Sequence, residues 1–315
     1  MNCSICNSQK CNSYLNLYDD RYGFEGNFLL FKCSNCKHKF LNANFSPEQI
    51  TQLYTKYYPR ANFDIDRYLP YKEVKGIKAW LNGEYSSAFR WVPQNVSILD
   101  IGCGFGESLG YHHSRGCDAY GIEADENILK VAERFGYNIK VGVFEAEQYE
   151  TDFFDYVTLD QVIEHVANPV EFLKDIATVL KPGGVVIIST PNSEGWGARI
   201  FGKYWINWHT PYHIQFFSII SIENVAKQAG LSLEKVKTIT NSEWLFYQWI
   251  HLLTRPNEGQ PSAFWTYSKK LSLKKKIIIK FFSLIHKTKV NHLITRLFDA
   301  FGIGDNYLFM LRKKG

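Results

Sequence analysis

The chain has 315 residues, 45% of them hydrophobic, and a formal net charge of +5 at pH 7. This length and apolar content support one large globular domain with smaller attachments and argue against a disordered chain. No apolar run reaches the roughly 20 residues of a bilayer-spanning helix, and the amino terminus lacks a signal-peptide pattern. A cytoplasmic location is therefore the default expectation.

Four of the seven cysteines form two Cys-x-x-Cys pairs: Cys3, Cys6, Cys33 and Cys36. Each pair is a tight turn that directs two thiolates to one side, and two such turns complete a tetrahedral zinc site. Because four protein ligands leave no open coordination position, we expect structural zinc. Cys11 and His38 are near enough in the sequence to replace one ligand. The alternative is four free thiols, but residues 1–40 are too few to build a core without a staple.

Two helical segments are expected next. Ser46 is a typical N-cap, and Pro47 suits the first turn of a helix. A second helix is expected from about Tyr71 to Trp91. Residues 46–95 are expected to cover the ligand cleft of the following domain, although their aromatic side chains fit plain core packing equally well.

A glycine-rich turn follows the first apolar strand. The sequence ILDIGCGFG begins at Ile98, and its strand ends at an aspartate, Asp100. Its glycines leave room for a ligand to touch the backbone: Gly102, Gly104 and Gly106. Farther along, Glu123 ends a second apolar strand, where a carboxylate can accept both hydroxyls of a ribose. Together these features predict a site for a nucleoside-containing cofactor.

Strand and helix alternate from Asp152 to Asn192. The segment reads as a strand, a short loop, an amphipathic helix, a Pro-Gly-Gly turn and a buried strand. The apolar positions of the helix are spaced by three and four residues: Val170, Leu173, Ile176, Ala177 and Leu180. This spacing predicts a helix buried on one face.

Three motifs resemble those of class I S-adenosylmethionine-dependent methyltransferases: ILDIGCGFG, EHV and LKPGG. The resemblance runs from about Ile98 to Ser218. It implies a doubly wound α/β fold with a seven-stranded Rossmann-like sheet whose last strand is antiparallel, and S-adenosylmethionine as cofactor. The GxGxG spelling of the turn suits a ligand without a pyrophosphate, so a hydride-transferring enzyme is a poor second choice.

The resemblance assigns the cofactor contacts to the carboxyl ends of successive strands. Those expected at the methionine end and the sulfonium are Asp100, Gly102, Gly104, Asp160 and Gln161. Those expected at the ribose and the adenine are Glu123, Ala124 and, after a presumed third strand VGVF, Glu145.

The acceptor side is expected in Gly202–Phe217, a loop rich in aromatic residues that also holds two histidines and a proline. Tryptophan and tyrosine faces suit the C–H surfaces of a sugar, so we interpret the loop as a substrate wall. His165, His209 and His213 are the candidates for the catalytic base, because histidine titrates near neutrality. His209 is the preferred one, since His165 and His213 also fit roles in orienting loops.

Ubiquinone-type O-methyltransferases resemble this stretch too. Their acidic residue before the glutamate–histidine pair helps bind a divalent cation. Gln161 occupies that place here, which argues against a catalytic metal, although Asp160, Glu164 and His165 remain as ligands.

An insertion is expected before the last strand. Ser221–Gly230 reads as a helix, Leu231–Thr240 as the sixth strand and Asn306–Arg312 as the antiparallel last strand. Residues 241–304 lie between these two strands. Within them, Lys269–Lys289 holds eight lysines and no acidic residue.

This lysine-rich segment is predicted to be an amphipathic helix with one apolar face: Leu273, Ile277, Ile278, Phe281, Leu284 and Ile285. Such a helix suits peripheral contact of residues 269–289 with an anionic membrane, its lysine stems lying along the apolar face. The alternative is a helix packed on the protein with a solvated basic side.

The expected domains are a zinc ribbon (1–45), a helical cap (46–95), the methyltransferase core (96–240), the basic helical insertion (241–304) and the final core strand (305–315). The ribbon resembles one found in front of some sugar-modifying methyltransferases. Together with the EHV and LKPGG motifs and the aromatic acceptor loop, the ribbon supports the leading hypothesis, which is O-methylation of a sugar or a sugar-containing, lipid-linked intermediate of surface polysaccharide or antibiotic assembly.

Other functions share several of these features. N- or C-methylation of a small molecule uses the same motifs. Nucleic-acid methylation is suggested by the ribbon and the lysines. It is less favoured because DQVIEH stands where base methyltransferases often carry an Asn-Pro-Pro-Tyr-like signature, and because the excess charge is confined largely to one helix. A third class is a non-catalytic cofactor-binding protein. The glycine turn and Glu123 are intact, so nothing in these motifs favours this class.

Overall fold

The computed structural model describes residues 2–42, 45–57, 64–69, 71–266 and 271–315. Its larger sheet contains β4 (Ser97–Ile101), β5 (Asp118–Glu123), β6 (Asn138–Val141), β7 (Phe154–Asp160), β8 (Leu180–Pro191), β10 (Leu231–Ile239) and β11 (Asn306–Lys313). The order across this sheet is β10-β11-β8-β7-β4-β5-β6. Strands β4 to β8 are parallel, whereas β11 runs antiparallel to both β8 and β10. The expected seven-stranded methyltransferase fold is confirmed.

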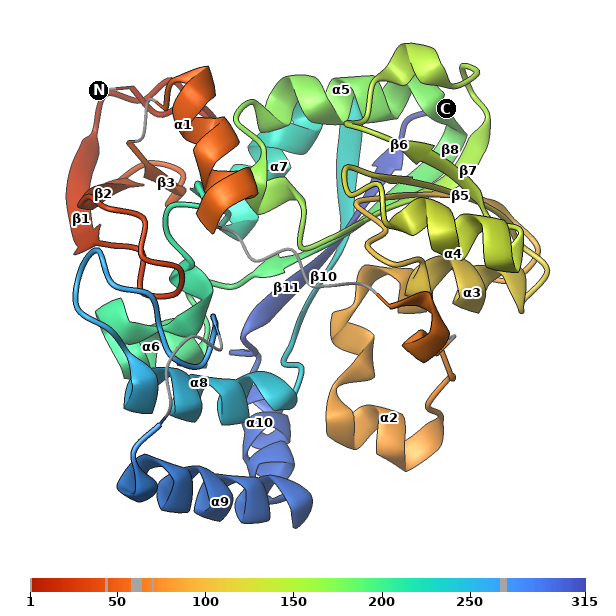
Figure 1. Cartoon of the computed structure of the whole chain (residues 1–315). Helices are drawn as coiled ribbons and strands as arrows, with labels where there is room; N and C mark the ends of the chain where they lie inside the picture. The colour runs from red at the N-terminus through yellow and green to blue at the C-terminus, as the bar shows by residue number, and fades with distance from the viewer. Residues whose placement is uncertain (1, 43–44, 58–63, 70, 267–270) are drawn as a thin grey trace.

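Helices cover both faces of this sheet (Figure 1). They include α3 (Glu107–His113), α4 (Ile128–Phe135), α5 (Pro169–Val179) and α7 (Ile219–Gln228). Helix α6 (Trp196–Phe201) lies next to α8, and its Ala198 and Phe201 pack with the amino-terminal segment. Successive residues of β8 alternate between two hydrophobic clusters, since Val186 packs in the cluster with α5 and α7 while Val185 packs in the cluster of the opposite face. This period of two places a core on each side of the sheet.

A smaller sheet joins the amino terminus to the methyltransferase core. Its strands are β1 (Cys11–Leu17), β2 (Phe28–Cys33), β3 (Lys39–Leu41) and β9 (Gln215–Phe216). The last of these lies in the loop that follows β8, and it pairs antiparallel with β3 through Lys39 opposite Phe216. The Ser218 hydroxyl also donates to the Cys36 carbonyl at 2.6 Å. The amino-terminal segment is therefore built onto the core.

The segment before β4 is only partly helical. Ser46 is the N-cap of α1 (Pro47–Gln52), as expected, and forms a capping box with Gln49; a π-helical turn η1 (Leu53–Tyr57) follows. The prediction of one helix from Tyr71 to Trp91 is wrong. Helix α2 (Gly76–Asn82) ends at Gly83, whose φ of 76° is left-handed and whose Cβ would collide with the Thr240 carbonyl oxygen. The chain then forms only 3₁₀ turns, because a glycine in this conformation ends a helix.

The described residues also form short 3₁₀ turns: η2 (Ile65–Arg67), η3 (Glu84–Ser86), η4 (Ala88–Trp91), η5 (Ala146–Gln148), η6 (Ile163–His165), η7 (Gly202–Tyr204) and η8 (Ile206–Trp208). Turn η4 packs in the cluster that covers Ile98 and Ile187. It therefore takes the place of a longer helix on that face of the sheet.

The insertion before β11 is helical, as expected, with α8 (Glu243–Thr254), α9 (Leu273–Lys287) and α10 (Val290–Ala300). Lys269 and Lys270 of the lysine-rich segment lie outside the described residues. No helix among the described residues combines the length and the apolar character needed to cross a bilayer.

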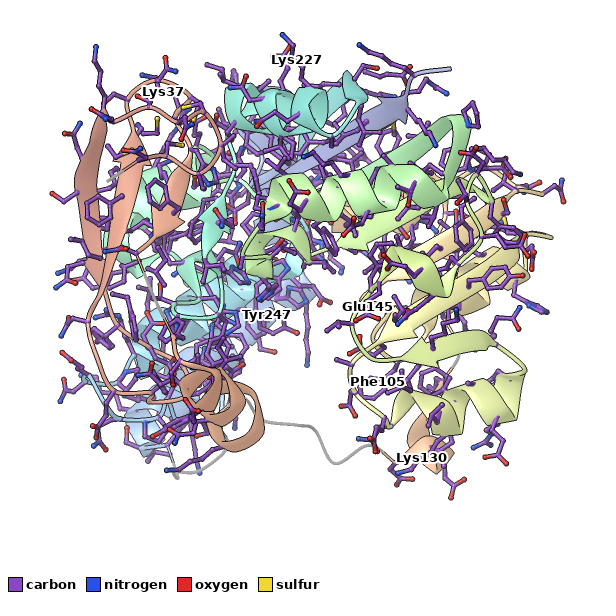
Figure 2. The ribbon with its side chains drawn as sticks, turned by 90° about the horizontal axis from the view of Figure 1, so that it is seen from above. Lys37, Phe105, Lys130, Glu145, Lys227 and Tyr247 are labelled. Carbon is purple, nitrogen blue, oxygen red and sulfur yellow. The ribbon has the colours of Figure 1, made fainter. Side chains whose placement is uncertain are left out.

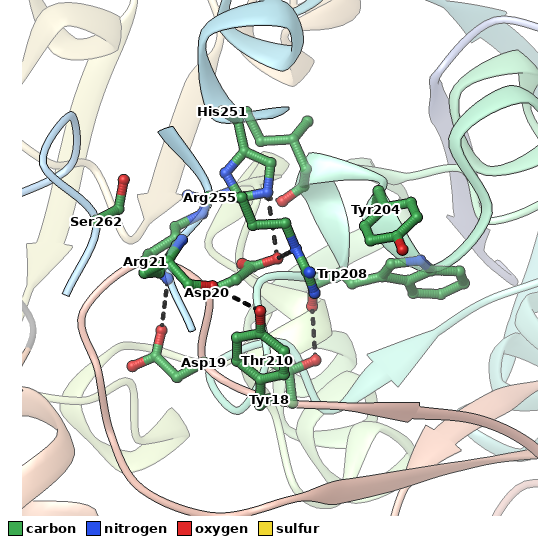
Figure 3. Close-up of polar contacts among 12 residues, drawn as sticks. Tyr18, Asp19, Asp20, Arg21, Tyr204, Trp208, Thr210, His251, Arg255 and Ser262 are labelled. Carbon is green, nitrogen blue, oxygen red and sulfur yellow. Dashed lines mark hydrogen bonds and ion pairs between the residues drawn. The ribbon is translucent and has the colours of Figure 1, made fainter. Parts of the chain in front are cut away.

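A polar network ties α8 to the amino-terminal segment (Figure 3). The Asp20 carboxylate accepts from His251 Nε2 at 3.2 Å and lies 3.5 Å from Arg255 Nε. The Arg255 guanidinium in turn lies over the rings of Tyr18 and Tyr204. Burial alone would raise the pKa of Asp20, but the hydrogen bond from His251 and the nearby guanidinium groups of Arg21 and Arg255 outweigh burial, and the pKa is lowered.

Candidate active site

A cavity of about 660 Å³ lies at the carboxyl ends of the parallel strands. Its lining includes five of the eight predicted cofactor contacts: Gly102, Glu123, Ala124, Asp160 and Gln161. Aromatic and aliphatic side chains supply much of the remaining wall: Phe105, Val143, Phe144, Val162, Val166 and Phe172. The volume and the mixed lining are those of a small-molecule pocket, at the strand ends where open α/β sheets bind ligands.

Glu123 organises the turn that borders this cavity. One carboxylate oxygen accepts the Gly104 N–H at 3.0 Å, and the other accepts the Asp125 N–H at 3.0 Å. Gly102 adopts a φ of 74°, and a Cβ there would lie 2.6 Å from Val162 Cγ2. The turn therefore requires glycine at 102 both for its conformation and for its approach to the next loop.

Asp100 lies beneath the turn. It is 3% exposed and accepts the Thr158 hydroxyl at 2.6 Å, together with a second hydrogen bond from the Ser108 hydroxyl. Burial raises the pKa of Asp100 to about 6, against the lowering effect of the two hydroxyls. The structure thus places Asp100 as a brace of the turn and not on the cavity lining.

Asp160 and Gln161 border the cavity at the end of β7. Burial, with a further contribution from the Asp100 charge, raises the pKa of Asp160 to about 7. Gln161 is held by its backbone N–H to the Ser189 carbonyl at 2.9 Å and by its side-chain amide to the Ser189 hydroxyl at 3.1 Å. This edge therefore presents a fixed amide beside a carboxyl group that titrates near neutrality.

The third strand differs from the prediction. VGVF was expected to be this strand, but β6 ends at Val141, and the next three residues are loop that lines the cavity. Glu145 is exposed and does not belong to that lining. In Figure 2 it lies with Phe105 on the side of the core that faces Tyr247 of α8. Of VGVF, only Val141 belongs to the strand, which begins earlier than expected, at Asn138.

His165 is the one predicted base that lines the cavity. Its Nδ1 lies 3.0 Å from the Tyr212 carbonyl oxygen. Burial lowers the pKa of His165 to about 4. The ring stands edge-on to His213, with 4.7 Å between centroids. His165 is therefore a neutral imidazole at neutral pH, with one nitrogen anchored.

His209 and His213 lie deeper. His213 Nδ1 is 2.9 Å from the Asn207 carbonyl oxygen, and His213 Nε2 is 3.4 Å from His209 Nδ1. His209 also stacks on Tyr212, with 4.9 Å between centroids. Burial lowers the pKa of both histidines well below the usual range. Neither histidine is among the residues that line the cavity.

The aromatic loop expected to form a substrate wall is buried instead. Trp205, Trp208 and Tyr212 are at most 3% exposed. They pack in a cluster with residues of the amino-terminal segment such as Leu17 and Phe24. The same sequence pattern fits a loop that lines a substrate site and a loop that is buried in the hydrophobic core. The long-range pairing of β3 with β9 buries this loop.

Glu164 was predicted only as one of the remaining ligands for a catalytic metal. In the structure its side chain is fully buried. One of its oxygens accepts the Thr190 hydroxyl at 3.0 Å, and the other has no hydrogen-bond partner among the described residues. Burial raises the pKa of Glu164 to about 8. Ligand atoms of Glu164, His165 and His213 lie within 4.8 Å of one another. Proton transfer and cation binding both fit this group.

The four cysteines of the Cys-x-x-Cys pairs converge, with all sulfurs within 4.8 Å. Two of the Sγ–Sγ distances are 3.6 Å. Zinc–sulfur bonds of about 2.3 Å in a tetrahedron require about 3.8 Å, so the geometry fits a zinc ion. Cys11 and His38 point elsewhere, since Cys11 Sγ approaches the Ser8 carbonyl and His38 Nε2 lies 2.7 Å from Gln215 Oε1.

A family model described as a methyltransferase domain matches residues 54–236, more than half of the chain. The chain belongs to this methyltransferase family. The sequence-based expectation of a class I methyltransferase is confirmed at this level. The match spans the glycine turn, the cavity and His165, and it excludes the first three strands of the smaller sheet, β1, β2 and β3.

Among curated proteins, the chain is similar to the ubiquinone biosynthesis O-methyltransferase of Maricaulis maris, with 34% identity over 44% of this chain and 60% of that protein. For the Parvibaculum lavamentivorans protein of the same name, the identity is 30% over 47% of this chain and 63% of that protein. The chain thus spans less than two thirds of the length of these two relatives.

Solved structures with a similar fold include a putative sarcosine dimethylglycine methyltransferase from Galdieria sulphuraria, with a TM-score of 0.46, 15% identity, and coverage of 75% of this chain and 84% of that one. Another is phosphoethanolamine N-methyltransferase 2 of Haemonchus contortus in complex with S-adenosyl-L-methionine, with a TM-score of 0.45, 22% identity, and coverage of 72% and 50%.

Proposed function

We propose that the protein transfers the methyl group of S-adenosylmethionine to a hydroxyl oxygen of its acceptor, with His165 as the base. The observation that carries this proposal is the position of His165 on the cavity wall, with Nδ1 anchored on the Tyr212 carbonyl. When bound, the cofactor supplies a methyl group that is already electrophilic. The protein must therefore hold the acceptor in line and remove one proton.

The residues at the strand ends fit this cofactor. The Glu123 carboxylate uses two backbone N–H partners and retains further lone pairs, which suit ribose hydroxyls. Ala124 and the apolar loop residues Val143 and Phe144 provide a surface for an aromatic base. Asp160, when ionised, places a negative charge at the edge where a sulfonium is expected.

The proton step uses the neutral form of His165. A carbonyl oxygen only accepts hydrogen bonds, so the Tyr212 contact keeps a proton on Nδ1 and leaves the lone pair on Nε2. Burial keeps this imidazole uncharged at neutral pH. Nε2 then takes the acceptor proton as the oxygen attacks. Glu164, protonated up to about pH 8, stands beside it without adding a competing negative charge.

The acceptor is proposed to be a hydroxyl group on an apolar body. The support is the apolar wall of the cavity and the similarity to proteins named ubiquinone biosynthesis O-methyltransferase. The sugar-containing, lipid-linked acceptor expected from the sequence rested on the family resemblance, the zinc ribbon and the aromatic loop. Because Trp205, Trp208 and Tyr212 of that loop are buried, this acceptor is the second candidate. Nucleic acid is not favoured by any feature of the cavity.

The test is an acceptor screen that measures how much S-adenosylhomocysteine is formed from S-adenosylmethionine. The protein is incubated with catechols and other phenols, with nucleotide sugars and with lipid-linked glycans. Turnover of phenols that is lost in His165→Ala supports the proposal. Turnover of nucleotide sugars alone would move the acceptor to the second candidate, and turnover unaffected by His165→Ala would remove the proposed base.

We infer further that Cys3, Cys6, Cys33 and Cys36 hold one structural zinc ion. The support is the convergence of the four sulfurs and their burial against the core, where the Cys3, Cys33 and Cys36 side chains are fully buried. Four thiolates leave no position for substrate, so this ion would stabilise the fold without taking part in methyl transfer.

A further inference from the structure

Helix α9 packs on the protein through one face only. Its Phe282 ring lies 5.3 Å from Trp249 of α8, and its His286 ring lies 4.9 Å from Phe246 of the same helix. No residue of α9 is buried. Figure 1 shows α9 at the edge of the molecule farthest from α5, with α8 on its inner side. The opposite face of α9 is therefore directed away from the body of the protein.

That outward face is apolar. Its large side chains are between 58% and 75% exposed: Leu273, Ile277, Phe281 and Leu284. Their spacing of four, four and three residues keeps them in one stripe along the helix. A helix packed only to hide its apolar side would turn this stripe inward. The structure instead exposes most of the apolar face predicted from the sequence.

Lysines border this stripe. At about 3.6 residues per turn, Lys274 lies about 60° from Ile277 on one side and Lys280 about 60° on the other, with Lys276 and Lys287 further round on the second side. Helix α9 contains five lysines and no acidic residue. The long lysine stems can lie along the apolar stripe while their ammonium groups reach past it.

Helix α10 also exposes apolar side chains, while its polar side packs against the protein. Four polar residues are buried: Asn291, His292, Thr295 and Arg296. Thr295 hydrogen-bonds Ser242, and Arg296 forms an ion pair with Asp299 at 2.9 Å. Apolar residues that face outward are between 57% and 73% exposed: Leu293, Leu297 and Phe301. Two consecutive helices thus leave apolar faces without cover among the described residues.

We propose that α9 and α10 form a docking surface for an anionic lipid bilayer, in which the apolar stripe enters the interfacial region and the lysines contact lipid phosphates. Charge selects this partner. A second copy of the chain at the same face would bring two sets of lysines together, whereas an anionic leaflet attracts each of them. Amphipathic helices of this composition bind in the plane of the interface without spanning it. The inference does not depend on the methyltransferase proposal.

The test is co-sedimentation of the full chain with vesicles of phosphatidylcholine alone or with 30% phosphatidylglycerol, at low and at physiological salt. One variant reverses charge, Lys276→Glu with Lys280→Glu. A second removes apolar contact, Ile277→Ser with Phe281→Ser. The control is Lys130→Glu with Lys227→Glu, two exposed lysines on α4 and α7 with the same change of charge.

We expect the wild type to bind the anionic vesicles and to bind less as salt rises. Each α9 variant should weaken this binding at least tenfold, and the control should stay within threefold of the wild type. The proposal is overturned if the wild type stays in the supernatant, or if the control loses binding as strongly as the α9 charge variant. It is also overturned if sedimentation velocity shows a dimer that Ile277→Ser with Phe281→Ser dissociates.

Discussion

His165 Nδ1 lies 3.0 Å from the carbonyl oxygen of Tyr212, and this contact determines which ring nitrogen holds the proton. Because the carbonyl can only accept, Nδ1 donates, and Nε2 keeps the lone pair of an uncharged ring. A residue of the buried aromatic loop thus fixes the tautomer of His165 in η6. The loop acts on the cavity through the backbone of Tyr212 and not through its aromatic faces.

Replacing His165 should therefore lower turnover with little effect on cofactor binding. We expect kcat to fall by about 10² to 10⁴ in His165→Ala, the usual contribution of a positioned general base. The matched control is His113→Gln, at an exposed histidine that ends α3. Steady-state kinetics on an acceptor found in the screen measures the change. An equal fall in both variants would argue against a role in proton transfer.

Because of Asp160, we expect the affinities for S-adenosylmethionine and for S-adenosylhomocysteine to depend differently on pH. The pKa of Asp160 is raised to about 7 by burial, so its charge is present above pH 7 and is lost as the pH falls below it. A bound sulfonium favours the charged carboxylate, whereas the neutral sulfur of S-adenosylhomocysteine does not.

Affinity for S-adenosylmethionine should therefore fall by up to about tenfold per pH unit below pH 7, relative to the affinity for S-adenosylhomocysteine. Calorimetric titrations of both ligands between pH 5.5 and 8 give this ratio. Asp160→Asn should make the ratio independent of pH. A ratio that is flat in the wild type would place the sulfonium away from Asp160.

Because the four cysteines converge, we expect one zinc ion per chain, and elemental analysis measures this content. Cys36→Ser should lose the ion, because three thiolates and a hydroxyl bind zinc poorly, and should unfold at a lower temperature. Cys11→Ser, which alters a half-buried thiol outside the cluster, should keep the metal. Loss of zinc in Cys11→Ser with retention in Cys36→Ser would reassign the ligands.

The sequence predicted the core of the fold well because its signals there are local. Buried strands, the glycine turn and the helix after Asn168 each depend on nearby residues, so β4, β5, β7 and α5 lie close to their expected ranges. Gly83 is an example of the opposite case. Its left-handed backbone, which meets Thr240 far along the chain, ends α2 where the apolar pattern suggested a continuous helix.

The candidate site was predictable where it follows the strand ends. Glu123 was predicted from its place at the end of a strand, and Asp160 and Gln161 were predicted from the family resemblance. All three line the cavity, because a parallel sheet gathers the ends of its strands at one edge. The positions of Asp100 below the turn and of His209 outside the cavity lining depend on tertiary packing instead. The pairing of β3 with β9 buries the loop that contains His209, and no pattern within Gly202–Phe217 shows this.

The Asp20 network predicts a stability effect far from the cavity. Because its pKa is lowered in the folded state, Asp20 contributes stability that is present above its unfolded pKa and is lost as the pH falls through the folded value. Asp20→Asn removes the charge opposite His251 and Arg255 and should lower the free energy of unfolding by about 1–3 kcal/mol at pH 7.

Urea unfolding at pH 7 measures this change, and Asp66→Asn, at an exposed carboxylate paired with Arg134, provides the control. An Asp20→Asn variant as stable as the control would mean that the network orders α8 without adding net stability.

Isothermal titration calorimetry shows whether the cavity at the strand ends binds S-adenosylmethionine through Glu123. The folded wild type should form a 1:1 complex with both S-adenosylmethionine and S-adenosylhomocysteine. Glu123→Gln should weaken both by about 10- to 100-fold, the value of hydrogen bonds to a charged group. The neighbouring Glu126→Gln should bind like the wild type. Absence of binding by the folded wild type, or equal affinity in Glu123→Gln, would contradict the account.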